Sequence, residues 1–200
     1  MPLAKRDVFD ARPTSVAATH VAPDSARRRE TETFIRDVFA RHYGADVTAF
    51  APNLMLLEQG ERIVAATGWR AASAESLFLE RYLDLPIEQA LAKLAGQPVR
   101  RERIVEVGNL AAEKSGSSLN VILGLGEYLD RQGYEWVVFT ATRELVGIFS
   151  RLGLPLLALA PADPARLGAE AEAWGSYYDM APIVVAGRIR LGLERGGRRK

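Results

Sequence analysis

The sequence predicts an α/β domain with a central sheet of mixed strand direction and helices on both faces. Two strand signals flank the turn Gln59-Gly60-Glu61, a pattern typical of an antiparallel hairpin. Farther along the chain, short apolar runs alternate with helical patterns, which is typical of strands joined by helices. At 200 residues, 48% of them hydrophobic and 26% charged, the chain has the size and composition of one globular domain.

Each helix and strand is predicted from hydrophobic spacing and from the residues that end it. Residues 1–25 lack periodicity and are expected to form a loose arm, with one short strand near residues 15–21. Residues 26–187 are expected to form the domain, and residues 188–200 a basic, flexible tail. The predicted elements of the domain are a helix to about residue 43, strands over 53–58 and 62–69, a helix over 73–96 split near Pro86, a strand over 104–111, a helix over 119–132, a strand over 135–140, a helix over 143–152, a strand over 154–160, a weak helix over 165–174 and a strand over 183–186.

The ends of these elements are marked by residues with unusual backbone freedom. Gly44, Gly133 and Gly153 follow three of the helices, where glycine readily takes the left-handed conformation that ends a helix. Pro86 suits the first turn of the second half of the split helix. Branched and aromatic residues dominate the strands, as in the run EWVVFT at residues 135–140.

The strand over 104–111 and the helix over 119–132 are joined by a small polar turn at residues 113–118. The helix is apolar almost all round, which is typical of a buried helix. Backbone N–H groups and the helix dipole converge at such a turn, so it could hold a pyrophosphate. The candidate anion-binding residues are Ser115, Gly116, Ser117 and Ser118. Alternatively, these small residues merely turn the chain.

Several classes of function are disfavoured by what the sequence lacks. With no cysteine and only two histidines, His20 and His42, we expect no disulfide, no thiolate catalysis and no metal site. There is no GxGxxG after a strand and no GxxxxGK[ST] motif. The net charge of +1, the lack of a secretory signal and the lack of a run of ~18 apolar residues favour a cytoplasmic protein without a nucleic-acid partner or stable membrane insertion. Nothing in the sequence fixes an oligomeric state.

Glu106 is the most suggestive single residue, because it lies in an apolar strand that enters the polar turn. Desolvation raises the pKa of a carboxylate in such surroundings, which suits a general base. Alternatively, Glu106 pairs with Arg101 or Arg103, or points outward. Asn109 could donate an amide hydrogen bond to a substrate carbonyl, or satisfy a strand bulge beside Gly108.

Two further groups of polar side chains are candidates for substrate contact. Glu80 and Asp84 are four residues apart in a predicted helix and share one face, where paired carboxylates could bind a cation or take a proton. The alternative is a solvated helix face. Tyr177 and Tyr178 form a small hydroxyl cluster near the C-terminal end of the domain.

Four runs of sequence carry a resemblance to a known family. They are LFLERYLDLPIEQAL, RIVEVGNLA, EWVVFTATRELVGIFSRLGLPLLALAPAD and WGSYYDMAPIVVAG. In this order, within residues 30–187, they resemble the thermostable hemolysin family. That family is similar to the GNAT (N-acyltransferase) fold and, within it, to acyl-homoserine-lactone synthases. Those enzymes carry a Glu in the central strand ahead of an aliphatic or aromatic residue and Ala, which here reads Glu106-Val107-Gly108-Asn109-Leu110-Ala111.

The resemblance implies a single GNAT-like domain that transfers an acyl group to a small amine acceptor. The acyl donor would be coenzyme A (acyl-CoA) or the acyl-phosphopantetheine of an acyl carrier protein. Glu106 would be the base, splayed strands would admit the pantetheine arm near Leu110 and Ala111, and residues 115–118 would hold the pyrophosphate. Alternatives are a membrane-active protein, as the family name suggests, and a catalytically silent GNAT-fold binding module.

The chain departs from the family pattern at two places. The pyrophosphate loop usually reads R/Q-x-x-G-x-G/A, whereas residues 113–118 read EKSGSS, with one glycine. This departure favours a carrier-protein donor. Phe149 stands where the fold often has a tyrosine general acid, so the proton donor would be Tyr177, Tyr178 or a water.

Overall fold

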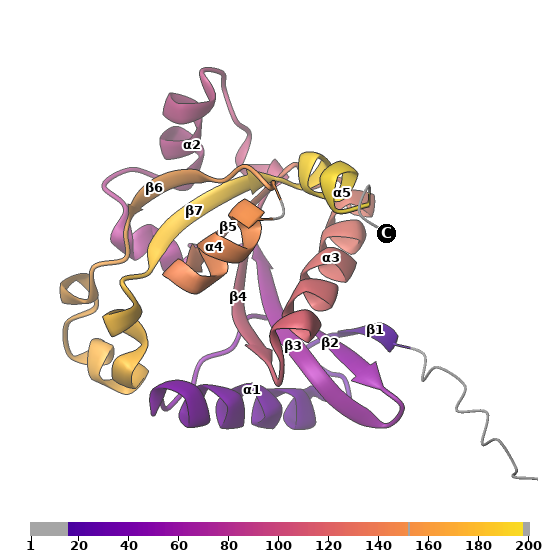
Figure 1. The fold of residues 1–200 in the computed structure, drawn as a ribbon. Helices are drawn as coiled ribbons and strands as arrows, with labels where there is room; N and C mark the ends of the chain where they lie inside the picture. The colour runs from indigo at the N-terminus through magenta and orange to yellow at the C-terminus, as the bar shows by residue number, and fades with distance from the viewer. Residues whose placement is uncertain (1–15, 152, 198–200) are drawn as a thin grey trace, which may run out of the picture.

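The computed structural model describes residues 16–151 and 153–197, so most of the predicted arm lies outside it. Within these residues, seven strands form one sheet in the order β1-β2-β3-β4-β5-β7-β6 (Figure 1). The strands are β1 (Val16–Val21), β2 (Asn53–Gln59), β3 (Arg62–Ala71), β4 (Ile104–Ala112), β5 (Trp136–Ala141), β6 (Leu157–Pro161) and β7 (Ile183–Arg188). The helices are α1 (Arg28–Tyr43), α2 (Ile87–Ala95), α3 (Ser115–Arg131), α4 (Arg143–Arg151) and α5 (Ile189–Gly197), with 3-10 segments η1 (Phe78–Tyr82), η2 (Arg101–Arg103) and η3 (Pro164–Met180). The predicted α/β class is confirmed.

Strand direction in the sheet is mixed, as predicted. Strands β1 to β4 are antiparallel neighbours, β4 and β5 are parallel, and β7 is antiparallel to both β5 and β6. The predicted hairpin is β2–β3, with Gly60 in its turn at φ 67°. Helix α3 provides the crossover that two parallel neighbours require.

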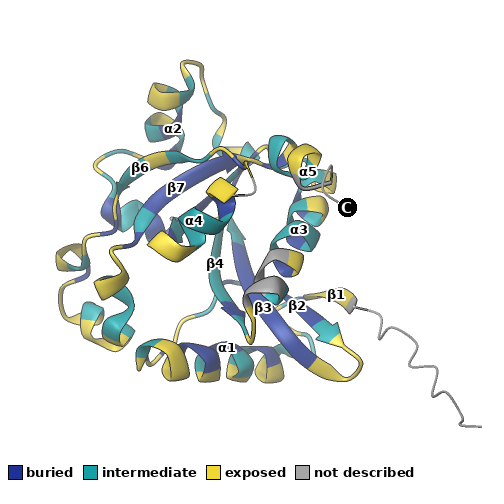
Figure 2. Cartoon of the chain, viewed as in Figure 1, coloured by how far each residue is buried: buried dark blue, intermediate teal, exposed yellow. Residues whose placement is uncertain are grey.

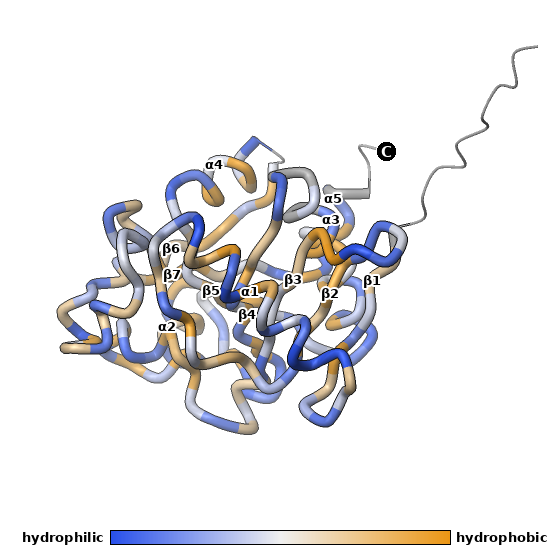
Figure 3. Tube along the Cα trace, turned by 90° about the horizontal axis from the view of Figure 1, so that it is seen from below, coloured by the Kyte–Doolittle hydropathy of each residue, from blue (hydrophilic) through white to orange (hydrophobic). Residues whose placement is uncertain are grey.

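Helices cover both faces of the sheet because successive strand residues point to opposite sides. Leu54 and Leu56 pack against α1, whereas Met55 and Leu57 pack against α3. The buried residues follow the strands, and the outer helix faces are exposed (Figure 2). The hydropathy of the chain shows the same division between apolar strands and polar outer segments (Figure 3).

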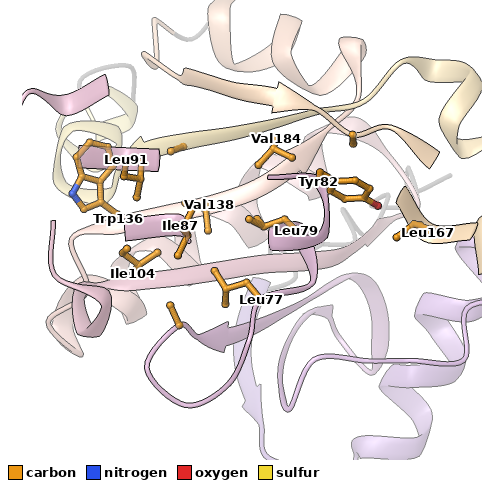
Figure 4. Close-up of a cluster of buried hydrophobic side chains, with 13 residues drawn as sticks. Leu77, Leu79, Tyr82, Ile87, Leu91, Ile104, Trp136, Val138, Leu167 and Val184 are labelled. Atoms are coloured by element: carbon orange, nitrogen blue, oxygen red, sulfur yellow. The ribbon is translucent and has the colours of Figure 1, made fainter. Parts of the chain in front are cut away.

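One apolar cluster fixes the segment between β3 and β4 on the sheet. Side chains of η1 and α2 pack onto β4, β5 and β7 there (Figure 4). Leu79, Ile87 and Leu91 have no exposed surface, and each fully buried leucine or isoleucine contributes about 1.5–3 kcal/mol. The cluster therefore holds η1 rigidly beside β4.

Strands β4 and β5 pair over only part of their length. Their parallel pairing begins at Ile104 and Trp136 and ends at Val107 and Phe139. Beyond that point β4 continues to Ala112 and β5 to Ala141, but the two strands separate. The sheet is therefore split toward the C-terminal ends of its two central strands.

A β-bulge in β4 accompanies the split. The register with β3 shifts between Ala66 and Gly68, and Asn109 has the left-handed φ of 50°. Asparagine tolerates this conformation better than most residues. The hydroxyl of buried Thr67 donates a 3.0 Å hydrogen bond to the carbonyl of Gly108, next to the bulge.

The structure differs from the sequence predictions most at three elements, and the strand predicted over 154–160 begins only at Leu157. The predicted helix over 73–96 is only η1 and α2, because residues 83–86 have no helical conformation. The helix predicted to begin near residue 119 begins at Ser115, and it is buried on one stripe, Val121, Leu125 and Leu129, rather than all round. The segment expected as a flexible tail contains α5, whose buried Ile189 gives it an apolar anchor.

Strand β1 was expected near residues 15–21 and is present. No helix in residues 16–151 and 153–197 is long and apolar enough to cross a membrane.

Candidate active site

A cavity of about 470 Å³ passes through the split between β4 and β5. Residues of both strands line it, among them Gly108 and Leu110 on one side and Phe139 and Thr140 on the other. Its volume lies in the range of small-molecule sites. The cavity has a polar end around Glu106 and an apolar chamber between α3, α4 and α5.

Glu106 lines the polar end, and the residue is 6% exposed. The backbone amides of Phe78 and Leu79 donate hydrogen bonds of 2.9 Å to its two oxygens. Burial raises the pKa of Glu106, while these two bonds and the nearby charge of Arg70 act to lower it. A carboxylate whose pKa lies above its ordinary value is a stronger base than an exposed glutamate.

The ion-pair partner of Glu106 is Arg70, not Arg101 or Arg103 as the sequence suggested. Arg70 stands directly opposite Glu106 in the β3–β4 register, and its Nε lies 3.2 Å from the carboxylate. Arg101 instead binds Glu80, and Arg103 donates to the carbonyl of Gly133. Arg70 also lines the cavity, so the polar end contains both charges.

The predicted tyrosine pair lies at the same end of the cavity. Tyr177 and Tyr178 both line it, and the Tyr177 hydroxyl donates to the carbonyl of Thr140 at 3.5 Å. The sequence analysis missed two further cavity tyrosines, Tyr43 and Tyr82, and the Tyr82 hydroxyl is 2.5 Å from that of Tyr178. Burial raises the pKa of all four phenols, so each holds its proton at neutral pH.

The path of η3 brings these tyrosines to the cavity. Gly175 has a φ of 53°, and a Cβ there would collide with the carbonyl oxygen of Tyr43 at the end of α1. Ser176 donates a 3.2 Å hydrogen bond to that same carbonyl. The rings of Tyr43 and Tyr177 meet edge to face, 5.3 Å apart. Close contact between η3 and the C-terminal end of α1 therefore fixes the position of Tyr177.

The carboxylate of Glu80, a predicted substrate-binding residue, is bound by other groups of the protein. Its carboxylate accepts 2.9 Å hydrogen bonds from the amides of Leu77 and Ile87 and is bound by both terminal nitrogens of Arg101. The Arg101 guanidinium is the main cause that lowers the pKa of Glu80 to about 2. With its oxygens occupied and without contact to the cavity, Glu80 joins η1, α2 and η2.

Asp84 also lies away from Glu106. It follows η1 in an irregular segment, so it does not share a helix face with Glu80 as predicted. Its carboxylate is 84% exposed and accepts a 2.5 Å hydrogen bond from Arg166. Among the described residues it borders a separate surface depression and not the cavity that contains Glu106.

Asn109 lines the cavity, but its amide group is bound to protein. Its Oδ1 accepts a 3.0 Å hydrogen bond from the amide of Ala51, and its Nδ2 donates to the carbonyl of Ala49 at 3.4 Å. The structure shows Asn109 in the bulge beside Gly108, which is one of the two roles considered from sequence. Asn109 holds the loop before β2 against the open edge of β4.

The predicted donor-binding residues divide between the cavity and the core. Leu110 lines the cavity, whereas Ala111 is buried in the cluster beneath α1. Ser115 begins α3, so the four predicted anion-binding residues form its first turn rather than a preceding loop. The side chains of Ser115, Gly116 and Ser118 lie outside the described part of the structure.

The first turn of α3 opens beside the cavity. Lys114, immediately before it, lines the cavity and adds a positive charge to the helix N-terminus. Glu113 also lines the cavity, but its charge is paired with Arg62. First-turn amides and a lysine together favour an anion at this mouth.

The chamber beyond the split is apolar. It lies between three helices whose cavity-facing residues include Ile122, Gly126, Leu145, Ile148, Phe149 and Leu193. Phe149, at the position of the expected tyrosine, packs 5.3 Å from Phe139, centroid to centroid. The apolar residues of α3 outside its buried stripe therefore face a cavity, which explains why the helix looked apolar all round.

No group of His, Cys, Asp and Glu side chains in the described residues could hold a metal ion. The polar end includes one buried carboxylate, one guanidinium and four protonated phenols. These groups can accept a proton, stabilise a negative charge and donate a proton. The arrangement suits acid–base chemistry next to a bound apolar chain.

Comparisons with known proteins agree with this architecture. The family model described as thermostable hemolysin matches residues 21–193, and no curated protein matches the chain. Among solved structures, the acyl-homoserine-lactone synthase LasI is similar with a TM-score of 0.62 at 12% identity, covering 90% of this chain and 95% of that one. The N-acyl amino acid synthase FeeM, from uncultured soil microbes, is similar with a TM-score of 0.61 at 16% identity, covering 90% and 94%. The CoA-dependent acyl-homoserine-lactone synthase BjaI, solved with SAM and isopentyl-CoA, has a TM-score of 0.62 at 16% identity, covering 92% and 89%. At these identities the likeness shows a shared fold.

Proposed function

The chain belongs to the thermostable hemolysin family, and we propose that it is an N-acyltransferase that moves an acyl group from a thioester to a small amine. One observation carries this proposal: a single cavity passes between the separated ends of β4 and β5. It joins a carboxylate and four phenols on one side of the sheet to an apolar chamber on the other. A thioester in the split would place its carbonyl between them.

The donor is a thioester of phosphopantetheine, carried by coenzyme A or by an acyl carrier protein. Beyond Val107 the edge of β4 toward β5 has no strand partner, so its backbone groups are available to the amides of a pantetheine arm. The first turn of α3 and Lys114 offer a site for the phosphate. BjaI is named as CoA-dependent, which supports coenzyme A as the carrier. The turn at residues 113–118 has a single glycine, which favours an acyl carrier protein.

The acceptor is a small amine that enters the polar end. A protonated amine is attracted to the Glu106 carboxylate, which then takes a proton from nitrogen and leaves its lone pair free to attack the thioester carbonyl. The tetrahedral adduct collapses with cleavage of the C–S bond, and the leaving thiolate takes a proton from Tyr177 or Tyr178. The tyrosinate takes the second proton of the attacking nitrogen, so the products are an amide and a free thiol, with the tyrosine restored and Glu106 protonated until it gives its proton to water.

The printed names of the structural neighbours fit this reaction class. One is an N-acyl amino acid synthase and two are acyl-homoserine-lactone synthases, each named for an acylated amine product. We further propose that the protein acts in the cytoplasm, where acyl-CoA and acyl carrier protein are found.

Native mass spectrometry of the purified protein tests the donor assignment. Retained coenzyme A, acyl-CoA or an acyl carrier protein would support it, as would binding of added S-acyl-pantetheine. If the protein carries no such cargo and binds neither acyl-CoA nor S-acyl-pantetheine, the proposed function is wrong.

A further inference from the structure

Two polar contacts hold helix α5 across one side of the apolar chamber. Its Arg190 forms a 2.9 Å ion pair with Asp130 of α3. Its Arg195 donates a 2.6 Å hydrogen bond to the carbonyl of Gly153, in the turn after α4. The two contacts lie on different neighbours, so α5 bridges α3 and the end of α4 (Figure 1).

The inner side of α5 forms part of the cavity wall. Ile189, Gly192 and Leu193 all line the cavity, and Ile189 is 5% exposed. Leu193 is seated against Gly126 of α3: a Cβ at residue 126 would lie 3.4 Å from its Cδ2. Glycine at position 126 therefore leaves room for the leucine side chain.

This part of the chamber offers little to a polar ligand. Leu193 packs in one apolar cluster with Leu125, Leu129 and Ile189, which also line the cavity. Arg188 also borders the cavity, but its guanidinium lies over the ring of Trp136, 4.7 Å from the centroid. Apolar walls of this kind match an aliphatic chain, whose burial is favourable in proportion to its length.

We propose that α5 is the end wall of an acyl-chain site and that Leu193 sets the longest aliphatic chain the site accepts. The inference rests on the proposed function, since it assumes that the thioester carbonyl lies in the β4–β5 split. From there the chain runs into the chamber until it meets Leu193. Removing part of this side chain lengthens the site, and enlarging it shortens the site.

The test uses Leu193→Ala and Leu193→Phe, with Leu191→Ala as the matched control. Leu191 is on the same helix and loses the same atoms, but its side chain is not part of the cavity lining. Calorimetry with S-acyl-pantetheines of increasing chain length measures affinity for the part common to both donors. Melting temperatures establish that each variant is folded.

In the wild type, affinity should rise about fourfold for each buried methylene and then level off at a limiting length. The limit should move to longer chains by about two carbons in Leu193→Ala and to shorter chains in Leu193→Phe, while Leu191→Ala keeps the wild-type limit. An unchanged limit in both Leu193 variants would overturn the role of Leu193 and leave the acyltransferase proposal intact. If neither S-acyl-pantetheine nor acyl-CoA of any chain length binds the wild type, both the proposed function and this inference are wrong.

Discussion

Val107 of β4 and Phe139 of β5 are the last paired residues of the two parallel strands. Glu106, whose carboxylate lines the polar end of the cavity, stands one residue before this point. The place where the strands part therefore fixes the distance between a candidate base and any ligand that enters the split. The predictions below concern the groups around this point.

Glu106→Gln should lower turnover by about 10²–10⁴-fold while donor binding persists, because glutamine keeps the size of the side chain but cannot take a proton. Steady-state kinetics and donor calorimetry on the same preparation check this. Glu170→Gln, at a surface carboxylate paired with Arg81, is the control and should keep full turnover. If Glu106 only anchors the amides of Phe78 and Leu79, the variant would instead melt earlier and keep its turnover.

Gly116→Asp should weaken donor binding at least ~10-fold, or about 1.4 kcal/mol, because it places a negative charge in the first turn of α3. The effect should be larger for coenzyme A donors than for S-acyl-pantetheine, which lacks the diphosphate. Gly116→Ala separates added bulk from added charge and should bind nearly as well as the wild type. Equal affinity of the Asp variant for acyl-CoA would show that the turn is only structural.

Tyr178→Phe or Tyr177→Phe should lower turnover by about 10²-fold if the missing hydroxyl protonates the leaving thiolate. Tyr82→Phe should have a smaller effect, because Tyr82 lines the cavity but its hydroxyl is paired with that of Tyr178. Tyr134→Phe, outside the cavity lining, serves as the control. Unchanged turnover in both single variants would assign the proton to water.

Glu80→Gln should destabilise the fold by about 2 kcal/mol, because Arg101 and two backbone amides lose a charged partner. The pKa of Glu80 is lowered from 4.5 to about 2, so its contribution is fully present above pH 4.5 and is lost as pH falls through about 2. Denaturant unfolding at several pH values should show a weaker acid dependence between these limits in the variant. An identical pH dependence in both proteins would contradict the assigned role.

Much of the fold follows from local sequence patterns. The β2–β3 hairpin, the α3 crossover and the strand near residues 15–21 were readable because turn residues and apolar spacing are local signals. The separation of β4 from β5 was not, since the number of paired residues depends on how two distant segments meet. Helix α5 was missed because its sequence is basic, and its apolar anchors Ile189 and Leu193 gain meaning only beside α3.

The candidate site could be predicted from the sequence to a similar extent. Glu106 stood out as a charge in an apolar strand, but its partner Arg70 is set by the β3–β4 register. Glu80 and Asp84 were paired on the assumption of a continuous helix, which ends after Tyr82 in the structure. A helical spacing rule does not extend through an irregular segment.

The proposed acyl transfer is tested most directly by thiol release. The wild-type protein is incubated with an acyl-CoA or an acyl carrier protein donor, with and without a panel of small amines, and free thiol and N-acyl products are measured. Acyl transfer through the β4–β5 split predicts thiol release that depends on an amine, matches the amide formed and falls about 10²-fold or more in Glu106→Gln. Absence of amine-dependent release from both donors across the panel would contradict it.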